Sequence, residues 1–298
     1  MSLPTVTVVI PTLNRRAWVL EAVEAVCSQH YGAGIDIVVL DDGSVDGTAE
    51  ALRRRKWSRP VRIIETTERG PAAARNLGVV HATGDVVAFI DDDCVPQPGW
   101  IEHLAPAATA GGAGGTTLML SDGSLVADFI ASLWQEAAAP GEDASPQILS
   151  CNSAFRRDLL GDGFDEHFRR PGCEDTELAA RLGRRGVSLS IVEAAVVHHR
   201  PRSSFAGLVI AAFYYGRGWR RYREKDGRPL RPAQLVKMIA ALPFFLCLAH
   251  RHRGRGAVRA IAYAFLNRLR LAAAAAGALS GRWIYAGRGR STEAGASA

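Results

Sequence analysis

Cysteine is scarce in this sequence and is not arranged in pairs. The 298 residues contain five cysteines, an odd number, and no two of them form a C-x-x-C motif. Disulfide frameworks and structural zinc sites need paired cysteines, so the pattern argues against both and favours a reducing compartment. The five are Cys27, Cys94, Cys151, Cys173 and Cys247.

Long uncharged runs are also missing. The longest in the C-terminal third are residues 203–216, 238–250 and 271–281, all shorter than the roughly 20 residues that span a bilayer. We therefore expect no transmembrane helix. The chain enters the apolar segment at residues 5–10 without a preceding basic stretch, so we also expect no signal peptide.

Acidic residues are nearly absent from the last third of the chain. Residues 1–200 carry 18 Lys and Arg against 27 Asp and Glu, whereas residues 201–298 carry 18 against three. The formal net charge of +6 therefore hides an acidic part and a strongly basic part. We predict two regions, residues 1–202 and a basic amphipathic helical region over residues 203–298.

The basic region interleaves arginines with aromatic and aliphatic residues, notably over residues 203–223, 238–248 and 251–270. Such helices suit an anionic membrane surface, at about 1 kcal/mol per basic residue near the headgroups. The alternative is a helical cap that packs on the acidic part of the chain, and both can hold. No nucleic-acid-binding motif is present, so we expect no nucleic acid partner.

Apolar runs alternate with helical periodicity through the first 90 residues. Continuous apolar runs are typical of strands that are buried on both faces, and the alternation predicts an α/β fold with a mostly parallel sheet. The predicted strands are residues 6–10, 35–40, 61–65 and 86–90, and the predicted helices are residues 15–28, 47–56 and 71–81. Further on we predict a loop at 111–115, strands at 116–120, 150–155 and 188–197, and helices at 125–137 and 174–185.

The strand at residues 86–90 ends in three consecutive acids, Asp91, Asp92 and Asp93. Polar or acidic loops also follow two other predicted strands, at residues 12–14 and 41–42. Parallel strands with right-handed crossovers place these loops along one edge, where ligands bind in open α/β sheets. Adjacent carboxylates repel one another, which favours a hard cation such as Mg²⁺ or Mn²⁺. The alternative is a solvated acidic turn.

Five segments together resemble the inverting family 2 glycosyltransferases with the GT-A fold. They occur in the family's order and at similar spacing, and the resemblance covers roughly residues 5–200. The segments are residues 9–15 (VIPTLNR), 41–48 (DDGSVDGT), 69–78 (RGPAAARNLG), 89–94 (FIDDDC) and 172–178 (GCEDTEL).

The resemblance assigns roles to the acids. Asp91 and Asp93 match the family's D-x-D motif, which implies Asp93 as the direct metal ligand and Asp91 nearer the ribose. Asp92 lies between them in the same nucleotide-binding segment. Asp41 or Asp42 would hold the base and ribose of the nucleotide. Taken alone, Asp41 and Asp42 equally suit a plain turn.

Other residues take implied roles around these acids. Pro11 and Thr12, with Asn14, would wall the nucleotide pocket. Arg75 would grip the diphosphate from a helix N-terminus, although an arginine paired with a neighbouring acid is an equal alternative. Asp175 is the candidate general base, because inversion needs a carboxylate on the face opposite the leaving group. An acid favoured by the helix dipole is the alternative for Asp175.

A histidine after the last predicted strand would complete the metal's coordination. Two adjacent candidates are present, and His198 is favoured slightly over His199. Imidazole suits Mn²⁺ better than Mg²⁺. A paired histidine at a strand end is otherwise more often structural.

The resemblance implies transfer of a sugar from a nucleotide diphosphate-sugar, with a UDP-sugar favoured, to a lipid-linked or polysaccharide hydroxyl. The expected location is peripheral, on the cytoplasmic face of the membrane. Two alternatives are a sugar-phosphate nucleotidyltransferase and a nucleotide-binding scaffold without turnover. The first needs a glycine-rich basic loop where residues 11–14 read PTLN. The second has no need to keep three repelling carboxylates.

Overall fold

A computed structural model describes residues 2–67, 69–137, 148–229 and 256–286. The chain divides into two compact units, each described by itself below. The first comprises Met1–Asp122, Ile130–Arg170 and Glu174–Pro201. The second comprises Gly123–Phe129, Pro171–Cys173 and Arg202–Ala298.

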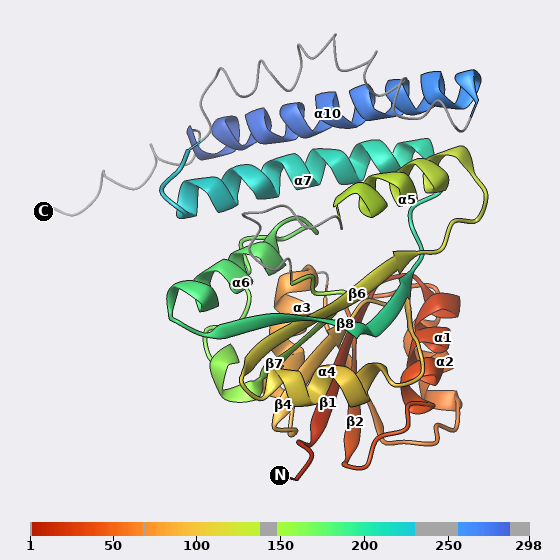
Figure 1. Cartoon of the computed structure of the whole chain (residues 1–298), viewed down its shortest axis with the longest axis vertical. Helices are drawn as coiled ribbons and strands as arrows, with labels where there is room; N and C mark the ends of the chain where they lie inside the picture. The colour runs from red at the N-terminus through yellow and green to blue at the C-terminus, as the bar shows by residue number, and fades with distance from the viewer. Residues whose placement is uncertain (1, 68, 138–147, 230–255, 287–298) are drawn as a thin grey trace, which may run out of the picture. The chain divides into compact units, whose positions relative to one another are not determined.

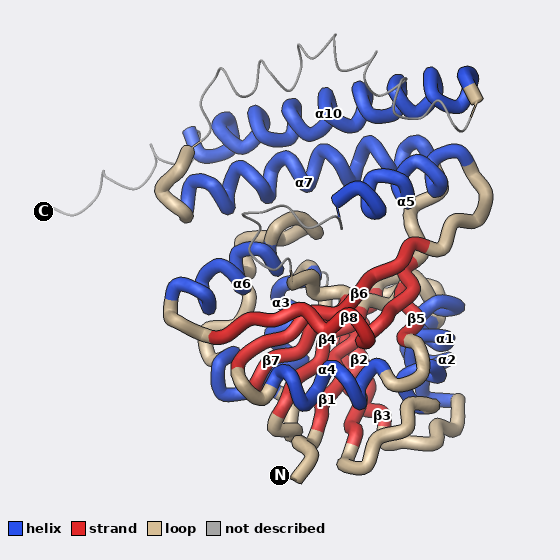
Figure 2. Tube along the Cα trace, viewed as in Figure 1, coloured by secondary structure: helices blue, strands red, loops and turns tan. Residues whose placement is uncertain are grey.

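The first unit is built on an eight-stranded mixed sheet (Figure 2). The strand order is β3-β2-β1-β4-β7-β6-β8-β5. Strands β3, β2, β1 and β4 are parallel, as the alternation of strands and helices predicts, whereas β7 runs antiparallel to both β4 and β6. The strands are β1 (Val6–Thr12), β2 (Ile35–Asp41), β3 (Val61–Glu65), β4 (Val86–Ile90), β5 (Cys94–Pro96), β6 (Gly111–Met119), β7 (Asn152–Arg156) and β8 (Ser188–His199).

Helices cover both faces of this sheet (Figure 1). Helix α3 packs on β1 and β2, and α4 packs on β6, β7 and β8. The helices of this unit are α1 (Arg16–Cys27), α2 (Thr48–Arg54), α3 (Pro71–Val80), α4 (Trp100–Ala108) and α6 (Glu174–Arg184), with a 3₁₀ turn η1 (Arg157–Leu160). Helix α5 (Leu125–Ala137) is divided between the two units, and α7 (Phe205–Lys225) and α10 (Ala257–Ala286) belong to the second.

The apolar strands are buried on both faces. In β1, Val8 and Ile10 join a core cluster with α1 and α4, whereas Val9 joins a cluster with α3 and α6. Successive side chains of a strand point to opposite faces, so a strand between two helical layers must be apolar at every position. This confirms the prediction that these runs are buried strands.

The prediction of a loop at residues 111–115 is wrong, because Gly111–Met119 forms strand β6. The glycines permit close approach of the neighbouring strand β8. A Cβ on Gly111 would lie 2.3 Å from the Ser188 carbonyl oxygen, and one on Gly115 would lie 2.1 Å from that of Ala195. A glycine-rich segment can therefore be a strand where another backbone comes close.

Two elements near the acids were not predicted from the sequence. The short strand β5 begins at Cys94 and pairs antiparallel with the end of β8, and α4 begins at Trp100. Strand β8 extends to His199, so both histidines lie within the strand rather than after it. This pairing brings the end of β8 to the residues that follow the acidic triplet.

In the second unit, helices α7 and α10 lie side by side and run in the same direction (Figure 1). Glycines allow their backbones to approach, because a Cβ on Gly216 would lie 1.8 Å from the Ala274 carbonyl oxygen. Among the helices that the structure describes, none is both long and apolar enough to cross a membrane. The aromatic-containing stretch at 238–248 lies outside the described residues.

Candidate active site

The loops after β1, β2 and β4 meet at one edge of the sheet. The backbone N–H of Asp42 donates to the carbonyl oxygen of Thr12 at 2.9 Å. The Thr12 hydroxyl donates to Asp92 Oδ2 at 2.7 Å. These two bonds join the three strand ends directly, as the parallel arrangement predicts.

Asn14 fixes the turn after β1 against the loop after β2. Its backbone N–H donates to the Ser44 hydroxyl, and its side-chain Oδ1 accepts from the Val45 N–H, both at 2.8 Å. Asn14 has a φ of 53°, a left-handed conformation that asparagine tolerates better than most residues. Its side chain therefore shapes the edge, while the half-buried Pro11 continues β1 opposite Leu40.

Asp41 and Asp42 are both buried but differ in their partners. Both Asp42 oxygens accept backbone N–H bonds at 2.8 Å, from Arg69 and Gly70, which fixes the loop before α3. One Asp41 oxygen accepts from the Ser44 N–H at 2.8 Å, whereas the other, Oδ2, is buried and has no hydrogen-bond partner among the described residues. A buried acceptor without a partner is costly unless a ligand completes it. Of the two acids, Asp41 is the one with an oxygen left for a ligand.

Asp92 and Asp93 share one arginine that the sequence analysis did not assign. Arg15 Nη1 lies 2.7 Å from Asp92 Oδ1 and 2.7 Å from Asp93 Oδ2. Burial, together with the neighbouring Asp93 charge, raises the pKa of Asp92 to about 6. For Asp93, burial is outweighed by His199 and Arg15, which hold its pKa below its usual range. Arg15 therefore supplies part of the positive charge that the triplet needs.

Only one of the two candidate histidines faces the acids. His199 Nε2 lies 3.2 Å from Asp93 Oδ1, and its Nδ1 lies 3.2 Å from the Met119 sulfur. Although burial alone would lower it, the Asp93 carboxylate raises the pKa of His199 to about 9. His198 Nδ1 instead lies 3.1 Å from the Gln97 side-chain amide. The structure thus places His199, rather than the slightly preferred His198, beside Asp93, because neighbouring strand residues point to opposite faces.

Arg75 joins the acidic triplet to the start of α6. It donates to Asp91 Oδ1 at 2.6 Å and to Glu174 Oε1 at 3.1 Å, and its side chain is only 4% exposed. Burial opposes the charged form, but these two carboxylates raise the pKa of Arg75 above its ordinary value. Its Nε is buried without a hydrogen-bond partner. Arg75 therefore forms ion pairs with neighbouring acids. The sequence analysis gave this arrangement as the alternative to binding of the diphosphate by Arg75.

Asp175 follows Glu174 in the first turn of α6 and is partly exposed. Its Oδ2 accepts from the Ser150 N–H at 3.2 Å, and its Oδ1 accepts from the Thr176 N–H at 2.7 Å. The ion pairs of Arg75 connect the neighbouring Glu174 to Asp91. A carboxylate oriented by backbone donors and open to solvent is suited to accept a proton.

The donor set at Asp93 and His199 fits a divalent metal ion. A carboxylate and an imidazole are ligands that Mn²⁺ accepts, and the second Asp93 oxygen is held by Arg15. Asp91 faces Arg75 rather than this pair. The residues therefore fit the metal that the D-x-D resemblance implies, with Asp93 and His199 as the holding residues.

Two residues of this edge were quoted in the matching segments but given no role. Arg15 directly follows Asn14, and Glu174 directly precedes Asp175. Sequence reasoning passed over them because their partners are 77 and 99 residues away along the chain. The sequence feature that could have identified Arg15 and Glu174 is that each is a charged residue directly adjacent to a predicted site residue.

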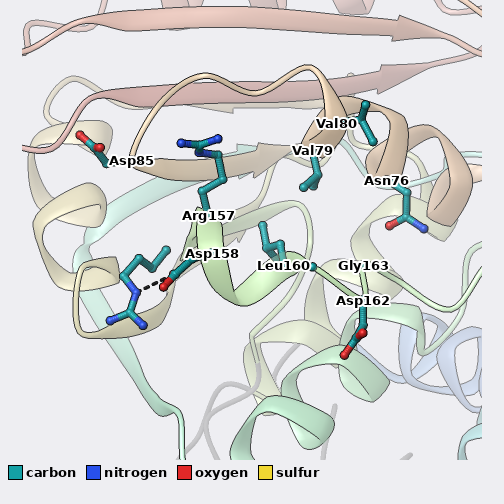
Figure 3. A pocket seen from close by; sticks show the side chains of 11 residues that line it. Asn76, Val79, Val80, Asp85, Arg157, Asp158, Leu160, Asp162 and Gly163 are labelled. Atoms are coloured by element: carbon teal, nitrogen blue, oxygen red, sulfur yellow. Dashed lines mark hydrogen bonds and ion pairs between the residues drawn. The ribbon is translucent and has the colours of Figure 1, made fainter.

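A separate pocket lies near the other end of β4 (Figure 3). It is lined by parts of α3 and η1, with Asp85, Arg157 and Asp158 among its charged residues. Arg156 pairs with Asp158 at 2.6 Å, and these side chains are 45% and 67% exposed. None of the predicted site residues lines this pocket, so it is distinct from the edge described above.

The mixed sheet, its helical layers and the acidic edge define a GT-A glycosyltransferase fold. The sequence pattern of the family described as glycosyl transferase family 2 matches residues 7–164. The chain therefore belongs to glycosyl transferase family 2, and its expected GT-A fold is confirmed.

Individual relatives agree with this assignment. Glycosyltransferase AglE of Haloferax volcanii is 27% identical over 226 residues, which cover 73% of each protein. Other curated relatives match over 88, 95 and 225 residues, and the chain spans less than half of their length.

Two solved structures share the fold. A mannosyltransferase from Pyrobaculum calidifontis, in complex with GDP-Man and Mn²⁺, superposes with a TM-score of 0.66 at 21% identity, over 95% of this chain and 88% of that one. S. aureus TarS 1–349 in complex with UDP gives a TM-score of 0.51 at 16% identity, over 94% and 92%.

Proposed function

We propose that this chain transfers a sugar from a nucleotide diphosphate-sugar to a hydroxyl group of a glycan or lipid-linked acceptor, with inversion at the anomeric carbon. The observation that carries the proposal is the convergence of acids from the ends of β2 and β4 beside the end of β1, with Arg75 joining Asp91 to the first turn of α6. Both similar structures hold a nucleotide or nucleotide-sugar on the same fold, which supports this donor class.

Asp41 serves the nucleotide. Its buried Oδ2 has no hydrogen-bond partner in the described part of the chain and accepts a hydrogen bond from the base or ribose. Thr12 and Pro11 form the adjoining wall, and Asp42 holds the loop before α3 in place. The two neighbouring acids therefore have different roles, because Asp42 is fully engaged with the backbone whereas Asp41 has an oxygen left for the nucleotide.

Asp93 and His199 hold a divalent ion, Mn²⁺ or Mg²⁺, and Asp91 lies on the nucleotide side. When bound, this ion neutralises the negative charge that develops on the departing diphosphate. Arg15 keeps Asp92 and one oxygen of Asp93 charge-balanced. Since Arg15 is one-third exposed, it is also free to turn toward the diphosphate.

Asp175 is the general base. The acceptor hydroxyl attacks the anomeric carbon from the face opposite the diphosphate, and its proton passes to a carboxylate oxygen of Asp175. The new carbon–oxygen bond forms as the bond to the diphosphate breaks, and the nucleoside diphosphate leaves with the bonding electrons. The backbone donors from Ser150 and Thr176 keep the Asp175 carboxylate oriented for this step.

The basic helical unit contacts an anionic membrane surface in this proposal. On α7 and α10, Phe205, Ile261 and Phe265 are 48%, 55% and 57% exposed. The Phe205 and Phe265 rings stack at 6.5 Å, so exposed apolar side chains gather near the starts of both helices. Co-sedimentation with vesicles containing phosphatidylserine, compared with phosphatidylcholine alone, tests this contact. Equal sedimentation with both vesicles would contradict it.

Calorimetric titration with UDP, GDP and dTDP, each with and without Mn²⁺, tests the nucleotide site. We expect Mn²⁺-dependent binding of one nucleotide, with a UDP-sugar favoured as the donor. Binding should be lost in Asp93→Ala and weakened in Asp41→Asn. Asp158→Asn, which changes an exposed acid in η1, is the matched control and should bind normally. Absence of binding for all three nucleotides would overturn the proposal.

A further inference from the structure

A thiol lies within the cluster that contains Asp93 and His199. Asp93, Cys94 and His199 each offer one ligand atom, and these three atoms all lie within 4.8 Å of one another. Asp93 Oδ1 is 3.2 Å from His199 Nε2 and 3.8 Å from Cys94 Sγ. Cys94 and His199 are directly opposite each other in the β5–β8 pairing. The proposed transfer reaction gives Cys94 no role.

The spacing of these atoms matches the edge of a tetrahedral coordination shell. Zinc bonds of about 2.0 Å to nitrogen or oxygen and about 2.3 Å to sulfur place tetrahedral ligands about 3.3–3.8 Å apart. The two contacts to Asp93 Oδ1 already have these lengths. An ion could therefore bind with little movement of the backbone.

A second thiol adjoins the first. The Cys151 thiol interacts with the Cys94 thiol, and both side chains are buried. The Thr117 hydroxyl lies 3.9 Å from the Cys151 sulfur. Cys151 itself lies outside the group of three ligand atoms that are all within 4.8 Å of one another.

The surroundings orient the cluster toward an ion. The Met119 sulfur can only accept a hydrogen bond from His199 Nδ1, which leaves Nε2 directed at Asp93. Arg15 binds the other oxygen of Asp93, so Oδ1 remains on the side of the thiol and the imidazole. Such outer contacts fix ligand orientation in metal sites.

We propose that Asp93, Cys94 and His199 form a three-residue site for a thiophilic divalent ion of the Zn²⁺ class. Thiolate and imidazole ligands favour such ions over Mg²⁺, which prefers oxygen. The Cys94 thiol releases its proton to solvent as its sulfur–metal bond forms. The site shares Asp93 and His199 with the proposed donor metal, so Zn²⁺ competes with Mn²⁺ there. Its formation requires no nucleotide.

Cobalt substitution tests the proposal in the full chain after treatment with EDTA. Co²⁺ reports on zinc-type sites because thiolate ligands give near-ultraviolet charge-transfer absorption and tetrahedral geometry gives strong visible bands. We expect both for the wild-type protein, with displacement of Co²⁺ by Zn²⁺. Cys94→Ser should lose the thiolate absorption and weaken Zn²⁺ binding at least about tenfold.

Cys27→Ser is the matched control, because Cys27 is a buried thiol outside the cluster. It should leave the cobalt spectrum unchanged, and circular dichroism checks that each variant folds. A wild-type spectrum without thiolate absorption would overturn the proposal, even if Cys94→Ser fails to fold. Retention of the full absorption in folded Cys94→Ser would overturn it as well. The nucleotide titrations with Mn²⁺ are read separately, so this result is distinguishable from failure of the transferase proposal.

Discussion

The two ends of β4 both carry aspartates near arginines, but their environments differ. At the carboxyl end, Asp92 and Asp93 are 4% and 8% exposed, and their charges meet Arg15 and His199. At the amino end, Asp85 accepts hydrogen bonds from Thr5 in an exposed position (Figure 3). The same residue types thus form a buried charge network at one end and a solvated surface at the other.

The pKa values of the aspartates shift in different directions at the exposed and the buried end of β4. At the exposed end, hydrogen bonds from Thr5 lower the pKa of Asp85, and the bond from Arg156 lowers that of Asp158. At the buried end, loss of solvation raises the pKa of Asp92. Exposed ion pairs contribute little to stability, whereas breaking a buried pair is costly. We therefore expect substitutions at the carboxyl end to have large effects and those at the amino end small ones.

The largest effect is expected for Asp175→Asn at the carboxyl-end site. Removing a general base lowers the transfer rate by about 10²–10⁴-fold. Nucleotide affinity should not change, because Asp175 serves the acceptor. Release of nucleoside diphosphate from the sugar donor measures the rate, and calorimetry measures the affinity. An unchanged rate would remove Asp175 from the role of base.

Arg75→Met should destabilise the protein by about 3–5 kcal/mol, the usual cost of removing one partner from a buried ion pair. The substitution leaves Asp91 and Glu174 without their shared arginine. Urea denaturation measures the free energy of unfolding, and Arg75→Lys, which keeps the charge, should lose less. A loss below about 1 kcal/mol, the range of exposed pairs, would mean that burial does not set the difference between the two ends.

The Asp93–His199 pair predicts a pH dependence of stability in EDTA. The pKa of His199 is about 9 in the folded protein against 6.5 for the free side chain, so folding favours its protonated form. The pair's contribution is full below pH 6.5 and is lost as the pH rises through about 9, by an amount on the order of 3 kcal/mol. The contribution of the pair to stability also decreases in acid. Because the pKa of Asp93 is lowered in the folded protein, folding favours its ionised carboxylate, and protonation of this carboxylate destabilises the folded state.

Unfolding free energies from pH 5 to 10, for wild type and His199→Gln, measure this dependence as their difference. His167→Gln is the control, because His167 pairs with Asp165 but is 74% exposed. Its difference from wild type should stay flat over the same range. A flat difference for His199→Gln would contradict the predicted coupling.

The smallest effect is expected for Arg156→Ala beside η1. Its partner Asp158 is 67% exposed, and exposed pairs are worth about 0–1 kcal/mol. Urea denaturation should therefore give nearly the wild-type free energy of unfolding, and sodium chloride should remove any remaining difference. A loss comparable with that of Arg75→Met would show that the amino end is also a coupled network.

Much of the fold was open to prediction from local patterns. The parallel strands β1 to β4 and the helices between them follow from continuous apolar runs and helical periodicity, both of which are local properties of the sequence. Proline at the start of α3 was likewise predicted from its preference for a first turn. The strand ends, and hence the acidic edge, followed from the parallel arrangement.

Contacts between distant segments were not open to local prediction. From the sequence, the three consecutive acids were interpreted as having no positively charged partners. In the structure, Arg15, Arg75 and His199 contact them from distant parts of the chain. Gly111 and Gly115 of β6 were predicted as loop residues because the β8 backbone, which leaves no room for a Cβ at these positions, lies far away along the chain.

The sequence by itself determined the class of fold, the edge at which the acids gather and the family resemblance, because apolar periodicity and short motifs are readable locally. Only the tertiary structure decided that His199 rather than His198 meets Asp93, that Asp41 rather than Asp42 keeps an unpartnered oxygen, and that Cys94 joins the cluster. The physical reason is that strand pairing sets which face a side chain takes, and burial sets what its charge requires.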